Sequence, residues 1–138
     1  MFGFSLLTVL AAYGGTALVF FGIDFLWLTV LGIVFYRAEI GDLLLDQPNL
    51  LPAALFYLFY VAGLVGFAIL PALHAGSWLW ALLAGVALGL LAYGTYDMTN
   101  LSTLKGWSLN ISVIDMAWGG FLSGISALAG YWVAKLTT

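Results

Sequence analysis

The chain has 138 residues, of which 64% are hydrophobic and only 7% are charged. Soluble domains average about 25% charged residues, so this composition, with a mean hydropathy of +1.14, predicts an integral membrane protein whose main partner is the lipid bilayer. Three basic residues and a net charge of −3 exclude nucleic-acid binding. Without cysteine, and with a single histidine, the chain offers no thiolate or bis-histidine ligation, so we predict no cofactor and no metal site.

Four apolar segments are long enough to cross a bilayer, which requires about 20 residues per helix. They run from about 4 to 36, 51 to 70, 78 to 98 and 110 to 135. The first exceeds the required length, so we expect it to tilt, to protrude from the membrane or to bend, with Gly14-Gly15 as the natural bend point. Asn49 is a suitable cap for the second, and we expect that helix to stop before Pro71. The sequence therefore predicts a single all-α domain over residues 1–138, an integral membrane four-helix bundle.

The connections between these helices define two ends of the bundle. Residues 37–49 hold half of the six acids and several leucines, which predicts a short helix on the membrane surface between helices one and two. Four crossings place this segment at the same end as Lys105, which we name side B. Both termini and His74 lie at the opposite end, side A. Arg37 and Lys105 weakly favour a cytoplasmic side B.

Three acids lie inside the apolar segments: Asp24, Asp97 and Asp115. Ionisable residues in hydrocarbon cost several kcal/mol and are functional candidates by default. Each falls on a polar or aromatic stripe of its helix, and their distances from the helix ends place all three toward side B. We therefore predict a polar pocket open to one leaflet. In the alternative interpretation, Asp97 is interfacial and Asp115 only complements a helix terminus.

The predicted ligand-binding site joins these acids to the aromatic and polar residues near them. Its members are Asp24, Trp27, Tyr36, Arg37, Tyr93, Tyr96, Asp97, Asn100, Asp115 and Trp118. Three ionised carboxylates would repel one another, so at least one is expected to be protonated or paired. The planar guanidinium of Arg37 is the preferred bridge between two of them.

Two Asp-x-x-Trp units begin at Asp24 and at Asp115, in helices that run antiparallel. Inverted repeats are typical of transporters. Because the surrounding residues do not repeat, we interpret the two units as convergent chemistry.

Gly120 and Gly124 form a G-x-x-x-G motif on the last helix. This motif allows two helices to approach closely. It predicts a contact either with another helix of the same bundle or with a second protomer in a homodimer.

Several of these residues also carry a family resemblance. They are Asp24-x-x-Trp27, Tyr36-Arg37, Tyr96-Asp97-Met98-Thr99-Asn100 and Asp115-x-x-Trp118-Gly119. Over nearly its whole length the chain resembles the DUF2177-type family of small four-helix bacterial membrane proteins, a domain of unknown function. The resemblance implies a multi-pass protein of the bacterial inner (cytoplasmic) membrane and implies no activity.

Three functions fit these features. The preferred one is the binding or translocation of a small cationic or amphipathic molecule, linked to proton exchange, because acids predominate in a chain with few other charges. The alternative is an intramembrane enzyme that acts on a lipid-like substrate from one leaflet. A second alternative is an accessory or assembly subunit, in which the polar cluster only fixes helix packing.

Overall fold

The computed structural model describes residues 2–138, and every regular element in that range is a helix. The elements are α1 (Leu6–Leu26), η1 (Trp27–Leu31), α2 (Gly32–Ile40), η2 (Gly41–Leu43), α3 (Leu50–Leu64), η3 (Val65–Ile69), α4 (Leu70–Ala75), α5 (Trp78–Thr103) and α6 (Leu109–Lys135). In the described chain they form four helices long and apolar enough to span a membrane, Leu6–Leu43, Leu50–Ala75, Trp78–Thr103 and Leu109–Lys135. The predicted all-α membrane bundle is therefore confirmed.

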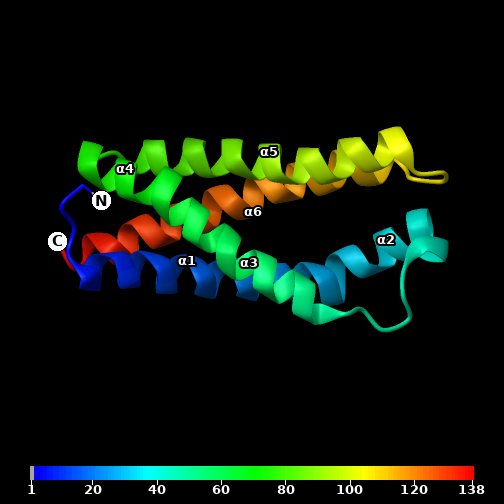
Figure 1. Ribbon diagram of the computed structural model, residues 1–138, viewed down its shortest axis with the longest axis horizontal. Coiled ribbons are helices and arrows are strands. Elements are labelled where there is room, and N and C mark those ends of the chain that lie inside the picture. The colour runs from blue at the N-terminus through cyan, green and yellow to red at the C-terminus, as the bar shows by residue number, and fades with distance from the viewer. Residues whose placement is uncertain (1) are drawn as a thin grey trace.

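The spans run along the long axis of the molecule, with the α3–α4 span inclined to the others (Figure 1). Both chain ends and the turn between α4 and α5 lie at side A, whereas the α2–α3 connection and the α5–α6 loop lie at side B. α5 and α6 run side by side along their length, and α1 packs against α6. α3 crosses the bundle obliquely and makes its main backbone contact outside its own span with α1. The bundle is therefore tight on the α1–α6–α5 side and looser at α3.

Small residues allow the close approach of α5 and α6. A Cβ atom added to Gly85 would lie 2.8 Å from the Cβ of Ala127, and one added to Gly124 would lie 2.6 Å from Cγ2 of Val86. Gly120 faces the same helix, where its Cβ would meet Leu90 at 3.1 Å. The G-x-x-x-G motif is thus used within the bundle, the first of the two predicted alternatives.

The first span is irregular at a different place from the predicted one. α1 runs as a regular helix through Gly14 and Gly15, and the change comes at the π-helical turn η1. Gly15 serves packing rather than bending, because a Cβ there would lie 2.9 Å from Cβ of Val133 on α6. The predicted surface helix is also wrong: residues 37–40 belong to α2, and a single 3₁₀ turn, η2, follows before the chain becomes extended.

The second span continues through Pro71 to Ala75, whereas the sequence predicted a stop at Leu70. Proline lacks an N–H and crowds the carbonyl four residues before it. The π-helical turn η3 directly precedes α4 and widens the helix, and Pro71 then occupies a first-turn position where no N–H is needed.

The third span also extends beyond the predicted Met98, to Thr103. The hydroxyl groups of Ser102 and Thr103 donate to carbonyls four residues earlier, each at 2.8 Å. The polar side chains at this helix end are therefore satisfied by the helix itself, and this allows the helical conformation to continue into a polar sequence.

Candidate functional site

Three acids from three helices are buried in the half of the bundle nearer side B. Asp24 on α1 is 5% exposed, Asp97 on α5 is 0% exposed and Asp115 on α6 is 9% exposed. The carboxyl of Asp115 lies beside that of Asp97 and within electrostatic reach of that of Asp24. The structure therefore gathers the three acids around Asp115, away from lipid.

The two Asp-x-x-Trp units are bonded to each other rather than internally. Nε1 of Trp118 donates to Oδ1 of Asp24 at 3.3 Å. Nε1 of Trp27 donates to the hydroxyl of Tyr36 at 3.1 Å, and that hydroxyl donates to Oδ1 of Asp115. Asp24 thus accepts a hydrogen bond directly from the tryptophan of the other unit, Trp118. Asp115 is linked to the tryptophan of the other unit, Trp27, through the hydroxyl of Tyr36.

The two indole rings of these units stack on each other. The centroids of Trp27 and Trp118 are 4.3 Å apart, and the ring planes are inclined by 12°. A carboxylate that accepts from charged or polar donors at fixed angles is held in one orientation. The stacked pair therefore ties the η1 turn to α6 and fixes the directions of the Asp24 and Asp115 carboxyl groups.

Asp97 has a different environment from the other two acids. Neither of its carboxyl oxygens has a hydrogen-bond partner among the described residues, and the hydroxyl of Tyr93, one turn earlier on α5, has none either. A buried polar group left without a partner costs about 1–3 kcal/mol, and more when it is ionised. The group nearest to the Asp97 carboxyl is the carboxyl of Asp115, and two adjacent carboxyls can form a hydrogen bond only when one of them carries a proton.

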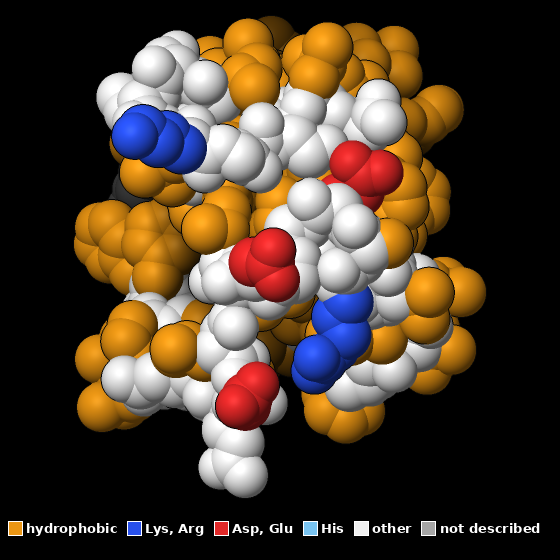
Figure 2. All heavy atoms as spheres, turned by 90° about the vertical axis from the view of Figure 1, so that its right-hand side faces the viewer, with side chains coloured by type: hydrophobic (Ala, Val, Ile, Leu, Met, Phe, Trp, Pro, Cys, Tyr) orange, Lys and Arg blue, Asp and Glu red, His pale blue; other side chains and the backbone are white. Residues whose placement is uncertain are grey.

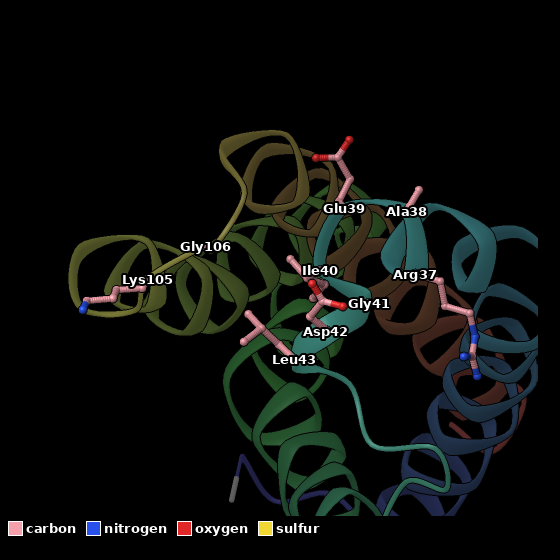
Figure 3. Close-up of a pocket in the computed structure, with 9 residues that line it drawn as sticks. All are labelled: Arg37, Ala38, Glu39, Ile40, Gly41, Asp42, Leu43, Lys105 and Gly106. Carbon is pink, nitrogen blue, oxygen red and sulfur yellow. The ribbon is translucent and has the colours of Figure 1, made fainter.

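The expected bridge from Arg37 to the carboxyls is not formed among residues 2–138. Arg37 lines a surface hollow at side B, together with Lys105 (Figure 3). Tyr36 takes the place at Asp115, and the next residue of an α-helix points about 100° away. The three buried acids thus have no basic partner within 4 Å in the described chain.

The remaining predicted residues lie at the edge of this cluster. Tyr96 is 57% exposed and packs edge-on against Trp107, with ring centroids 5.5 Å apart. Asn100 is half-buried beside it. Tyr96 and Asn100 therefore border the site on the outer side of α5 rather than lining the acids.

Two tyrosines outside the predicted set also reach the site, both from α3. Tyr57 packs against Phe20, with ring centroids 5.4 Å apart, and lies beside Tyr93. The hydroxyl of Tyr60 is hydrogen bonded to Oγ of Ser123 at 2.8 Å. The only sequence signal for them was their spacing of three residues on an apolar helix, which is common in packing positions.

Removal of the Tyr36 hydroxyl tests the bonded network. Tyr36→Phe leaves Nε1 of Trp27 and Oδ1 of Asp115 without this partner, so we expect a loss of about 1–3 kcal/mol in the free energy of unfolding. The tryptophan emission should change as well, because Trp27 stacks on Trp118. Both are measured during unfolding in mixed micelles.

Tyr13→Phe is the matched control for this substitution. The hydroxyl of Tyr13 also donates to an acceptor in another span, the carbonyl of Leu58 at 2.8 Å, but in an exposed position. Equal losses for the two variants, with an unchanged emission spectrum, would contradict the described network.

Fold and site together define a small multi-pass membrane protein with carboxyl groups clustered inside its bundle. The chain belongs to the family described as "Predicted membrane protein (DUF2177)", with a match over residues 9–132 that includes every residue of the predicted site. This confirms the resemblance seen in the sequence. No curated protein and no solved structure matches the chain.

Proposed function

We propose that this membrane protein binds a small cationic molecule at the carboxyl cluster and releases protons when it does so. The observation that carries the proposal is Asp97, which is fully buried and has both carboxyl oxygens unpartnered. An unpaired buried charge is far more costly than a neutral group. A protonated cluster in the free protein, and a cation in the bound protein, would each remove that cost.

The surroundings of the acids favour an organic cation over a metal ion. The described residues contain no group of three or more His, Cys, Asp or Glu that could hold a metal ion. Aromatic rings instead lie next to the carboxyls, namely the Trp27–Trp118 stack and Tyr93. Aromatic faces attract organic cations, by about 2 kcal/mol or more when the pair is desolvated.

Packing supports binding from one side rather than passage across the membrane. The side A half of the bundle is filled by a buried apolar cluster that includes Ala12, Ile69 and Ala127. Translocation requires access from both sides. We therefore propose that cation and proton are exchanged at side B. We also propose that the protein lies in the inner membrane of a bacterium, which its helical spans and its family resemblance fit.

The test uses methylammonium as the probe, because acids that are at most 9% exposed require a small cation, and the purified full-length protein in detergent. We expect it to quench tryptophan emission, because the stacked indoles adjoin the acids, and to release protons into a weakly buffered solution. Asp97→Asn keeps the shape of the side chain but cannot become anionic, so binding and proton release should fall at least about tenfold.

Asp42→Asn is the matched control, since it makes the same chemical change at an exposed acid outside the bundle. It should bind the probe as the unaltered protein does. Binding that survives Asp97→Asn, or binding without proton release, would overturn the proposal.

A further inference from the structure

The second span has two halves that differ in how firmly they are packed. Its side A half lies in two apolar cores shared with α1, α5 and α6, and its buried residues are Val61, Leu64, Val65, Ala68, Ile69, Leu70, Ala72 and Leu73. In the side B half, residues 50–60, the structure describes every residue and none is buried. Local opening is easiest where few apolar groups are buried. The side B half is therefore the more easily displaced part of this span.

Two hydrogen bonds attach the side B half to the rest of the bundle. The hydroxyl of Tyr13 donates to the carbonyl of Leu58 at 2.8 Å. The hydroxyl of Tyr60 is bonded to Oγ of Ser123, also at 2.8 Å. Since each bond involves a side-chain hydroxyl, both can break without the loss of any backbone hydrogen bond within a helix. The attachment is therefore one that can open and form again.

The side B half covers the carboxyl cluster through Tyr57. The ring of Tyr57 packs on Phe20, one helical turn before Asp24, and lies beside Tyr93. Its hydroxyl is within electrostatic reach of both Asp24 and Asp115. Because the three acids are at most 9% exposed, a cation can reach them only when a covering segment moves. Displacement of this half would carry Tyr57 away from the carboxyls.

A pivot for such a movement lies where the two halves join. α3 ends at Leu64, and the π-helical turn η3 follows it. Gly63 and Gly66 lie on either side of this junction, and a Cβ added to either would have nothing within 4 Å. Close packing therefore does not require these two glycines, whereas they leave the backbone more conformational freedom than any other residue would. π-Helical turns are also frequent at functional sites.

The end of the side B half that would move lies where the molecule is polar. Residues 44–49 connect η2 to α3 without helical structure, and all of them are exposed. α3 and α5 diverge toward this end, whereas α4 lies beside α5 at side A (Figure 1). Figure 2 shows charged side chains of both signs over side B. An opening at this end would therefore connect the acids with water rather than with hydrocarbon.

We infer that residues 50–60 are a lid, which turns about Gly63 and Gly66 to open the carboxyl cluster and closes again over the bound cation. The inference rests on the proposed function, because it names the movement by which that cation enters. The hinges of such lids are a few residues that absorb the change in dihedral angles. Entry and release require the same opening, so a stiffer hinge should slow both and leave the affinity unchanged.

Electron paramagnetic resonance of the spin-labelled full-length protein in detergent tests the movement without a ligand. The chain has no cysteine, so labels can be placed only where they are wanted. Leu50→Cys with Leu109→Cys labels the first residues of α3 and α6. Ala75→Cys with Lys135→Cys labels the last residues of α4 and α6, and is the matched control. We expect a broad distance distribution for the first pair and a narrow one for the control pair.

Alanine at the two glycines tests the hinge. Gly63→Ala/Gly66→Ala should narrow the distribution of the first pair of labels. It should also lower the association and dissociation rates of methylammonium about tenfold each, at unchanged affinity, when tryptophan emission is followed by stopped flow. Gly14→Ala/Gly22→Ala is the matched control, because a Cβ at either position of α1 would also have nothing within 4 Å. It should change neither the distances nor the rates.

The outcomes separate the lid from the proposed function. Equally narrow distributions for the two pairs of labels would overturn the inference, and so would a distribution that Gly63→Ala/Gly66→Ala leaves unchanged. A lower affinity in place of slower rates would contradict it as well. Absence of methylammonium binding to the unaltered protein would instead overturn the proposed function, whereas a broad distribution that the alanines narrow would still establish the movement.

Discussion

Gly119→Ala is expected to destabilise the protein by about 3 kcal/mol, because the new methyl group would overlap the ring of Tyr93. The added Cβ would lie 2.7 Å from Cδ2 of that ring and closer still to two other ring atoms. A Cβ added to Gly89 would in turn overlap the backbone of Gly119, so α5 and α6 leave no space for an extra methyl group at this point. Equilibrium unfolding in mixed micelles measures the loss.

Gly14→Ala is the control for this substitution, since a Cβ at Gly14 would have nothing within 4 Å. Alanine favours a helix over glycine by about 0.5–1 kcal/mol, so this variant should be as stable as the unaltered protein or slightly more stable. If the two alanine variants unfold at the same point, α5 and α6 are not in the close contact described.

The affinity for methylammonium is expected to rise about tenfold for each unit of pH if one proton leaves the cluster per cation bound. The sign follows from competition: at low pH protons occupy the carboxyls that the cation needs, and at high pH those carboxyls are free. Asp97→Asn should flatten this dependence as well as weaken binding, because it removes an exchangeable proton. Fluorescence titrations between about pH 5 and 9 measure both effects.

Asp42→Asn should keep the full pH dependence, since Asp42 lies outside the bundle. An affinity for the probe that does not change with pH would show that no proton is displaced. In that case the cation would bind without exchange for a proton, and the role of the acids would be to fix the packing of the helices.

The spans and the acids could be predicted from the sequence because each depends on one strong physical effect. Long apolar segments in a chain with 7% charged residues have no stable place outside a bilayer. An acid in such a segment must turn away from lipid, so Asp24, Asp97 and Asp115 had to face the bundle interior. That reasoning needs no knowledge of which side chains they meet.

The hydrogen-bond partners could not be predicted, because they depend on helix phase. Trp27 and Tyr36 are nine residues apart and lie on opposite faces of a regular helix, at about 100° per residue. The π-helical turn between them changes that phase and brings them together. Arg37 was expected at the carboxyls from its charge, but the same change of phase gives that position to Tyr36.

The helix that packs against Gly120 and Gly124 could not be predicted from the sequence for a related reason. The sequence of Gly120 and Gly124 identifies a helix face without a bulky side chain, but it does not identify the helix that lies on it. Only the structure shows that Val86 and Leu90 of the same chain fill that space. Likewise, nothing in the residues before Pro71 signals the π-helical turn that lets the second span continue.

A π-helical turn holds one residue more than an α-helical turn, and in the first span this surplus lies between two parts of the site. Deletion of a single residue from Trp27–Leu31 would let the turn close into an ordinary one, and the chain would still insert as a continuous span. Everything after the deletion would nevertheless rotate by about 100°, and the Tyr36 hydroxyl would leave Asp115. The extra residue thus lets the two halves of one long helix take independent rotations, so insertions and deletions here change the arrangement around the carboxyl cluster more than they change membrane insertion.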